Sequence, residues 1–423
     1  MATNTLWQQS EVMRRKGILP KWTTNHSLIL SLIPIREVTQ INEKDFRIPV
    51  QLDSGGRYST YDPDFGDMPR GSSGTGTEMT ATYFPTTIAF EMSHLKAQAT
   101  TGPNALMPEF KRALKDAPKE FAQYEDGSFL SDGSAVTAVA TAHATSGGYS
   151  VYTLDGGMGT ARVRRGMYVT VYATAYASIK AQGVYVRSID YANNKVTLSV
   201  TVTGAANNDI LCYDGVSTVG SAPAWKQGLF YVNSDAASGT YYALNRATEP
   251  ECIANVVDMS SGEVGVMDGL LLLDRIGKRT GTEPMELVGL ANTAQRAVII
   301  QQQDTNSTYM REPAGRPGFA DSLPKLGEAF PWCGIKHYLT FKEDSTRIDW
   351  IKPSTWGRAQ LPDGDVDFFT LQGDRPMRFF SIPGSNGAPA AGTWFALTKS
   401  ENWYCVSPRE QGYLKNCAKP SRY

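Results

Sequence analysis

Few residues in this sequence stand at the spacings that catalysis or metal binding requires. None of the four histidines pairs with another histidine, a cysteine or an acid at a ligand spacing: His26, His94, His143 and His337. The five cysteines contain no C-x-x-C pair, which favours buried free thiols over a disulfide framework or a zinc site. Nucleophile elbows, P-loops and H-E-x-x-H helices are absent from the sequence. We therefore predict a protein that is not an enzyme, with no catalytic residue, no metal site and no cofactor.

The stretch GGMGTARVRRG (156–166) comes nearest to a phosphate-binding loop, but no apolar strand precedes it. Its arginines could contact a phosphate or a partner's carboxylates, although a solvated or internally paired face is the simpler interpretation: Arg162, Arg164 and Arg165. The net charge of the chain is −1, which argues against general affinity for nucleic acid.

Composition bounds the class of protein. With 423 residues, of which 41% are apolar, the chain can bury a substantial core, and its β-branched and aromatic residues favour an α+β fold. The N-terminus has no signal-peptide core, and no apolar run reaches the ~18 residues of a membrane span. We therefore expect a soluble protein made in a cytoplasm, without a membrane partner.

The first 95 residues read as projecting segments. Residues 1–44 form an arm, with a short amphipathic helix predicted around 5–16. Residues 45–95 contain two strand-like stretches that flank a Gly/Ser-rich tip. An isolated two-stranded ribbon is marginally stable in water, so a second copy of the chain is the natural support. The alternative is a pair of ordinary strands in a compact sheet.

Residues 96–159 contain a long amphipathic helix, predicted over 104–125, with a proline inside it. The residues predicted to pack along this helix are Leu106, Phe110, Leu114, Pro118 and Phe121. Proline removes a backbone donor and clashes with the preceding turn, so the helix is expected to be kinked at Pro118.

The remaining chain divides into three parts. Residues 160–216 alternate like the strands of a small barrel of about five strands, with a hairpin turn at 192–194. Residues 217–341 mix helices, predicted at 265–281 and 294–303, with strands, predicted at 283–291 and 335–341, which indicates an α/β layer. Residues 342–423 return to β structure.

This order of parts resembles the major capsid proteins of tailed bacteriophages, which have the Hong Kong 97-type fold. The resemblance rests on the Gly-tipped hairpin, the kinked helix ending near DGS (126–128), LNRATEPECIANVVD (244–258) and WYCVSPREQGYLKN (403–416). It implies an E-loop at 45–95, a peripheral domain with the spine helix at 96–159, an axial domain at 217–341 and a return to the peripheral domain at 342–423. The small β domain at 160–216 would be an addition to the minimal fold.

Two departures from the family pattern follow from the sequence. Some members join subunits through an E-loop lysine, but no lysine stands between Asp45 and His94, so we predict no such crosslink from this loop. Only about 44 residues precede the hairpin, so a separate scaffolding protein is expected in place of a cleaved scaffolding segment.

The resemblance implies a structural subunit that assembles with itself into hexamers and pentamers of an icosahedral head. That head would enclose double-stranded DNA without sequence-specific binding, alongside a portal and possible decoration proteins, and would be built in the host bacterial cytoplasm. The candidate intersubunit contacts are Arg57, Asp62, Asp64, Arg70 and Glu78. Two alternatives stay open: an encapsulin-like nanocompartment, and a carbohydrate-binding or carbohydrate-active protein using Trp350, Trp356, Trp394 and Trp403 as surface aromatics.

Overall fold

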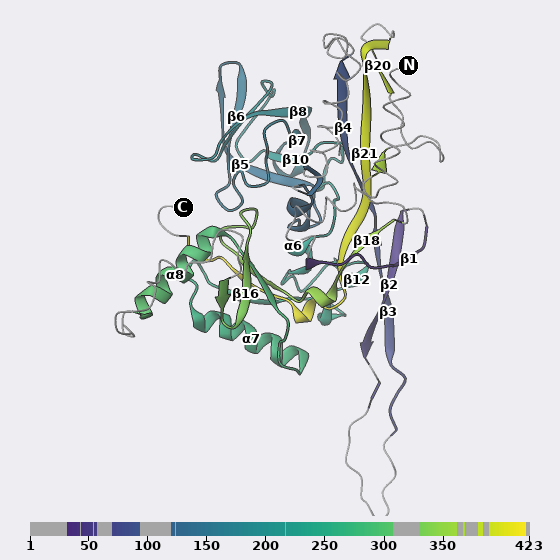
Figure 1. Cartoon of the computed structure of the whole chain (residues 1–423), viewed down its shortest axis with the longest axis vertical. Coiled ribbons are helices and arrows are strands. Elements are labelled where there is room, and N and C mark those ends of the chain that lie inside the picture. The colour runs from purple at the N-terminus through teal and green to yellow at the C-terminus, as the bar shows by residue number, and fades with distance from the viewer. Residues whose placement is uncertain are drawn as a thin grey trace, which may run out of the picture.

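The structure of the protein is a computed structural model of the whole chain. The residues that the structure describes are 32–42, 44–53, 55–56, 70–93, 120–122, 124–215, 217–307, 330–361, 367–368, 380–383 and 389–419. Figure 1 shows a narrow ribbon projecting from one end and a long strand pair running to the other, with a barrel and a sheet flanked by helices alongside.

The long strand pair belongs to a five-stranded sheet organised on β21. This strand pairs antiparallel with β4 over ten residues, from Gly392↔Ser93 to Glu401↔Phe84. The members of the sheet are β4 (Phe84–Ser93), β18 (Trp356–Gln360), β19 (Asp367–Phe368), β20 (Phe380–Pro383) and β21 (Pro389–Cys405). Strands far apart in sequence therefore close this sheet.

A helical segment at 120–122 and 124–129 packs against the sheet and fills its core. Phe129 places its ring 5.1 Å from that of Trp356 and 5.2 Å from that of Trp403, and all three side chains are buried. Such aromatic contacts contribute both buried area and favourable ring geometry. The segment is thus held firmly at its C-terminal end.

The projecting ribbon is the antiparallel pair of β2 and β3, with a two-residue edge strand at its base. Its bounds are β1 (Thr39–Gln40), β2 (Asp45–Asp53) and β3 (Thr75–Thr82). The pairing runs from Asp45↔Thr82 to Asp53↔Thr75 with one irregularity near its outer end.

A closed barrel forms the second body. Its strands are β5 (Val136–Ser146), β6 (Tyr149–Leu154), β7 (Tyr168–Tyr172), β8 (Ile179–Asp190), β9 (Lys195–Leu198) and β10 (Ile210–Tyr213), in the order β10-β5-β6-β9-β8-β7. Alternate side chains fill the interior, including Val169, Val186, Val196 and Leu198. Closure leaves no free sheet edge on this body.

The barrel begins earlier than the β domain predicted at 160–216. Strand β5 is rich in alanine, which has weak β propensity, and its pairing with β10 and β6 makes it part of the barrel. The strand predicted over 167–176 ends at Tyr172, because Ala175 and Tyr176 adopt positive φ in the short 3₁₀ turn η1 (Thr174–Tyr176). The predicted hairpin turn at 192–194 joins β8 to β9.

The third body is a six-stranded mixed sheet with two helices. Its strands, in spatial order, are β13 (Asn255–Asp258), β22 (Gly412–Lys415), β17 (Ile348–Ile351), β14 (Val288–Ala291), β16 (Ile335–Leu339) and β15 (Phe330–Trp332). The helices are α7 (Val266–Thr280) and α8 (Thr293–Ser307), at the predicted places. Because β17 and β22 lie inside this sheet, the boundary predicted at 341 does not separate two bodies.

Local chemistry sets the ends of α7. The Asp268 carboxylate accepts from the backbone N–H of Gly265, which caps the first turn, and Gly281 takes φ 70° just after the last turn. Short elements complete the chain between barrel and sheet: α6 (Leu229–Val232), β11 (Thr240–Tyr241), β12 (Leu244–Asn245) and η2 (Pro250–Cys252).

Candidate assembly surfaces

The ribbon changes character along its length. At its base, Phe46, Ile48, Met79 and Ala81 are buried in the core that also holds Trp356 and Trp403. Beyond this base no residue of β3 is buried: Glu78, Gly76 and Thr75 are exposed, and Thr77 is half-buried. A two-stranded ribbon cannot bury both of its faces by itself. The outer half of this ribbon is therefore either marginally stable or stabilised by packing against another surface.

Two of the five predicted contact residues lie in the described part of the ribbon. Glu78 pairs with Arg47 of the same chain at 3.3 Å, with both side chains about half exposed. Such exposed pairs contribute roughly 0–1 kcal/mol, so Glu78 stays available to a partner. Arg70 is exposed near the outer end. The other three, Arg57, Asp62 and Asp64, lie outside the described residues.

Of the predicted spine-helix residues, only Phe121 is described, and its side chain is 1% exposed. Leu106, Phe110, Leu114 and Pro118 lie outside the described residues, and the predicted kink with them. The described helical turns that follow Phe121 carry an unexpected group, the buried carboxylate of Glu125.

Glu125 belongs to a buried network of five charged side chains. The Lys226 ammonium donates to both Glu125 oxygens, at 2.7 and 2.9 Å, and to a Glu401 oxygen at 3.2 Å. The second Glu401 oxygen lies 2.7 Å from Lys399 Nζ and 3.6 Å from Arg358 Nε. None of the five side chains is more than 3% exposed. The network ties the helix, the segment after the barrel and the strands β18 and β21 together.

The two carboxyl groups of this network differ in pKa. Burial, and then the negative charge of Glu401, raise the pKa of Glu125 to about 7. Burial also opposes ionisation of Glu401, but three neighbouring cations, Lys399 first, outweigh it and hold its pKa well below the usual range. Removing one partner from such a network is costly, because the remaining charge is left in a dry interior.

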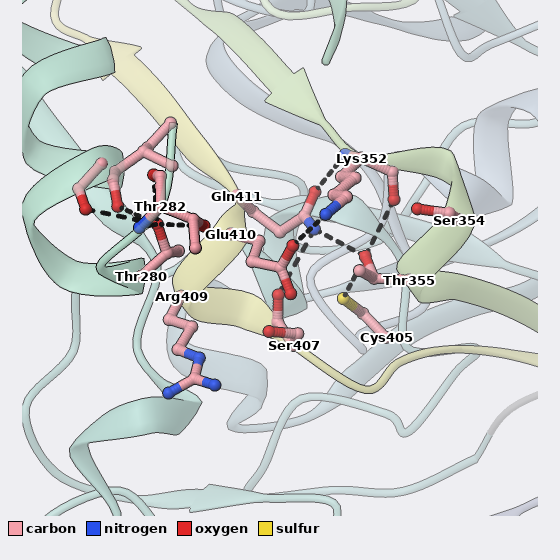
Figure 2. A network of polar contacts seen from close by, with 12 residues as sticks. Thr280, Thr282, Lys352, Ser354, Thr355, Cys405, Ser407, Arg409, Glu410 and Gln411 are labelled. Carbon is pink, nitrogen blue, oxygen red and sulfur yellow. Dashed lines mark hydrogen bonds and ion pairs between the residues drawn. The ribbon is translucent and has the colours of Figure 1, made fainter. Parts of the chain in front are cut away.

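Two chain segments cross between the five-stranded and six-stranded sheets, and Gln411 links them (Figure 2). One segment joins β17 to β18 through η4 (Pro353–Thr355), and the other joins β21 to β22 through η5 (Pro408–Glu410). The Gln411 amide accepts from the Lys352 backbone N–H at 2.8 Å and donates to Thr355 Oγ1 at 2.8 Å. This side chain is fully buried, so it fixes the two crossings to one another.

The remaining chemistry-bearing side chains serve the core. His337 donates from Nδ1 to the Ile335 carbonyl and accepts at Nε2 from Trp350 Nε1, at 3.0 and 2.7 Å. Burial lowers its pKa to about 4, so the ring is neutral. Trp350, Trp356 and Trp403 are fully buried, which overturns their expected role as surface aromatics. They pack instead in the two sheet cores, and Trp394 lies where no side chain is described.

No cluster of three or more potential metal ligands occurs among the described residues. Arg162, the buried member of the predicted basic cluster, donates to the Leu130 carbonyl at 2.8 Å and stacks over Phe230. Within the described part of the chain, no helix is both long and apolar enough to cross a membrane.

Comparison with known proteins places this architecture. No protein-family model and no curated protein matches the sequence. Among solved structures, a chain of the cyanophage A-1(L) capsid asymmetric unit matches with a TM-score of 0.51 and 11% identity, covering 93% of both chains. The chain shares its fold with a protein of a phage capsid.

Weaker matches include the capsid of the native GTA particle and the SrpI encapsulin of Synechococcus elongatus PCC 7942. The first has a TM-score of 0.43 and 10% identity, covering 92% of this chain and 89% of that one. The second has 0.40 and 9%, covering 93% and 90%. The capsid fold thus accounts for nearly the whole chain on the strength of the cyanophage match alone. The buried network and the Gln411 crossing were not predicted from the sequence, because neither leaves a local motif.

Proposed function

We propose that this chain is the major capsid protein of a tailed phage, which assembles into hexamers and pentamers of an icosahedral head around double-stranded DNA. The capsid fold over 93% of both chains is the observation that carries the proposal. The ribbon supports it independently, because the part of β3 from Glu78 to Thr75 has no buried residue in its own subunit. The role of the chain is structural, because a shell is held together by repeated interfaces between subunits and does not depend on a binding pocket.

The parts of the chain take the following places in the Hong Kong 97-type scheme. The ribbon is the E-loop, and the helix that ends near Phe129 is the spine helix of a peripheral domain built on the five-stranded sheet. The six-stranded sheet with α7 and α8 is the axial domain. The order and pairing of the elements support these assignments.

The barrel is an insertion between the spine helix and the axial domain. Its two ends meet in an antiparallel bridge, Ser134↔Ala224, where Ala135 N–H donates to Pro223 and Trp225 N–H donates to Gly133. A lobe whose start and end lie side by side can be added to a fold with little disturbance of the rest. This geometry supports a lobe that contacts either neighbouring subunits or solvent in the shell.

The partners follow from the same proposal. Other copies of the chain are the main partner, and a separate scaffolding protein and a portal complete the head, with decoration proteins as an optional addition. With a net charge of −1, the chain encloses DNA without sequence-specific binding. Its place is the virion, after assembly in the host cytoplasm.

The test is to produce the chain with and without its ribbon and to measure particle size by light scattering and electron microscopy. In the shortened variant, Val50 is joined to Thr77 by Asn-Gly, so that the buried base of the ribbon is kept. We expect the intact chain to form rings or closed shells and the shortened variant to stay folded but unassembled. An intact chain that remains a monomer or dimer, also with added scaffolding protein, would refute the proposal.

The contents of the particles distinguish a phage head from a nanocompartment. Particles formed during phage growth that protect double-stranded DNA from nuclease support the head. Particles that enclose a protein cargo instead would identify an encapsulin-like shell of the same fold.

A further inference from the structure

The axial body carries a groove along the second half of α7. The groove has a volume of about 730 Å³ and lies between α7, the segment that follows it and the turn joining β15 to β16. Leu273, Pro284 and Ile335 supply apolar walls. Gly277 leaves room on the helix side, since a Cβ there would meet only Pro284 and Thr282, both at 3.6 Å.

The apolar surface continues from the groove along the first turns of α7. Four large apolar side chains in this part of the helix are exposed, with Met267 at 76%: Val266, Met267, Leu270 and Leu271. Single exposed apolar residues are ordinary, but a run of four on one helix beside a groove marks an interaction surface. We call the groove and these four residues the α7 surface.

The charges around the α7 surface are mostly negative. Five acidic residues stand between positions 263 and 286, against three basic ones: Glu263, Asp268, Asp274, Glu283 and Glu286 against Arg275, Lys278 and Arg279. Lys278 is paired with Asp274 at 2.6 Å, and both arginines donate to backbone carbonyls of their own chain. A partner segment should therefore be apolar and basic.

The chain itself contains a segment of this kind outside the described residues. Residues 1–31 contain four basic residues and one acidic residue. Within them, residues 5–16 are predicted to form an amphipathic helix that carries Leu6, Val12 and Met13 and ends in Arg14, Arg15 and Lys16. Twelve helical residues span about 18 Å, and the fifteen residues of α7 span about 22 Å. The helix predicted at 5–16 therefore matches α7 in length, and its apolar and basic residues complement the apolar and acidic residues of the α7 surface.

We propose that the α7 surface binds residues 5–16 of a neighbouring copy of this chain. The described chain begins at Leu32, and the Ile35↔Arg358 bridge pairs it with β18 of the five-stranded sheet. The fifteen residues from 17 to 31 can span about 50 Å when extended, which suffices to reach another subunit. The proposal rests on the self-assembly proposed above and adds the surface on which one arm is held.

A photocrosslinking experiment on the intact chain tests this proposal. Trp7 is replaced by p-benzoyl-phenylalanine in one copy of the chain. This copy is co-assembled with ¹⁵N-labelled copies that keep Trp7, so that mass spectrometry distinguishes crosslinks between copies from crosslinks within one copy. We expect crosslinks to α7 or its groove walls, between copies. Filling the groove with Gly277→Phe should lower their yield about tenfold, equivalent to a loss of about 1.4 kcal/mol of binding. The matched control Gly277→Ala should change the yield less than twofold.

Three results would overturn the proposal: crosslinks to α7 within one copy only, crosslinks in particles that avoid α7, or a yield indifferent to Gly277→Phe. Particles without α7 crosslinks would leave the capsid function standing while this contact fails. Crosslinks to α7 between copies in small oligomers, with no particle formed under any condition, would support the contact while the capsid function fails.

Discussion

The buried charge network predicts an unequal response to the removal of its members. When ionised, it holds three cations, Lys226, Lys399 and Arg358, and two carboxylates. Glu401 contacts all three cations, so Glu401→Gln leaves them with Glu125 as the one carboxylate among the described residues. Removing a buried partner in this way costs about 3–5 kcal/mol of folding free energy.

Lys399→Met should behave differently. The Lys399 ammonium lies 2.7 Å from Glu401 but makes no hydrogen bond of good geometry, and Glu401 keeps two other cations after the substitution. The variant also balances the charges of the network. We therefore expect Lys399→Met to cost less than about 1 kcal/mol of folding free energy. The attraction to Glu401 is lost, but the variant no longer has to desolvate the lysine ammonium, and the two effects offset each other.

The assay is urea unfolding of the ribbon-shortened chain, followed by tryptophan fluorescence. Trp356 and Trp403 are buried against Phe129 beside the network and report its loss. Asp274→Asn, which removes an exposed pair on α7, is the control and should change stability by less than about 0.5 kcal/mol. If Glu401→Gln costs no more than Lys399→Met, the reasoning is wrong, and the network contributes through packing alone.

Three further predictions concern pH and packing. The folded state raises the pKa of Glu125 to about 7, so the proton on Glu125 stabilises the fold at low pH. As the pH rises from 4.5 to 7, the wild type should lose stability relative to Glu125→Gln. A gain in stability would contradict the assignment. His337, whose pKa is lowered to about 4 by burial, acts in the opposite sense: between pH 6.5 and 4 the wild type should lose about 3 kcal/mol relative to His337→Gln on acidification, measured by urea titration. Gly289→Ala would place a Cβ 2.0 Å from the His337 ring and should lower the free energy of unfolding by at least about 1–3 kcal/mol. The control Gly76→Ala, whose Cβ would have its nearest contact at 3.6 Å, should leave the melting temperature nearly unchanged. Equal effects of the two substitutions would show that the core adapts to the added methyl group.

Local patterns in the sequence predicted much of the element order. The periodicity and end signals of α7 and α8 are carried by residues close in sequence, and both helices form where expected. The alternation along β8 and β9 and the asparagine-rich turn between them work in the same way.

Long-range pairing decided the rest. Strand β5 joins the barrel through β10, some seventy residues later, and β17 and β22 enter the six-stranded sheet from the C-terminal segment. No local periodicity encodes which distant strand a strand will pair with, so the barrel takes in a strand from before residue 160 and the six-stranded sheet takes in strands from beyond residue 341.

The sequence by itself determined that the chain carries no recognisable catalytic or metal-binding motif, and it placed the helices predicted at 265–281 and 294–303. Only the tertiary structure decided that Glu125, Lys226, Arg358, Lys399 and Glu401 meet in a dry core and that the tryptophans lie inside. The physical reason is that charge and burial are properties of neighbourhoods in space. A lysine reads as a surface residue in any sequence until folding brings the carboxylates that allow it to be buried.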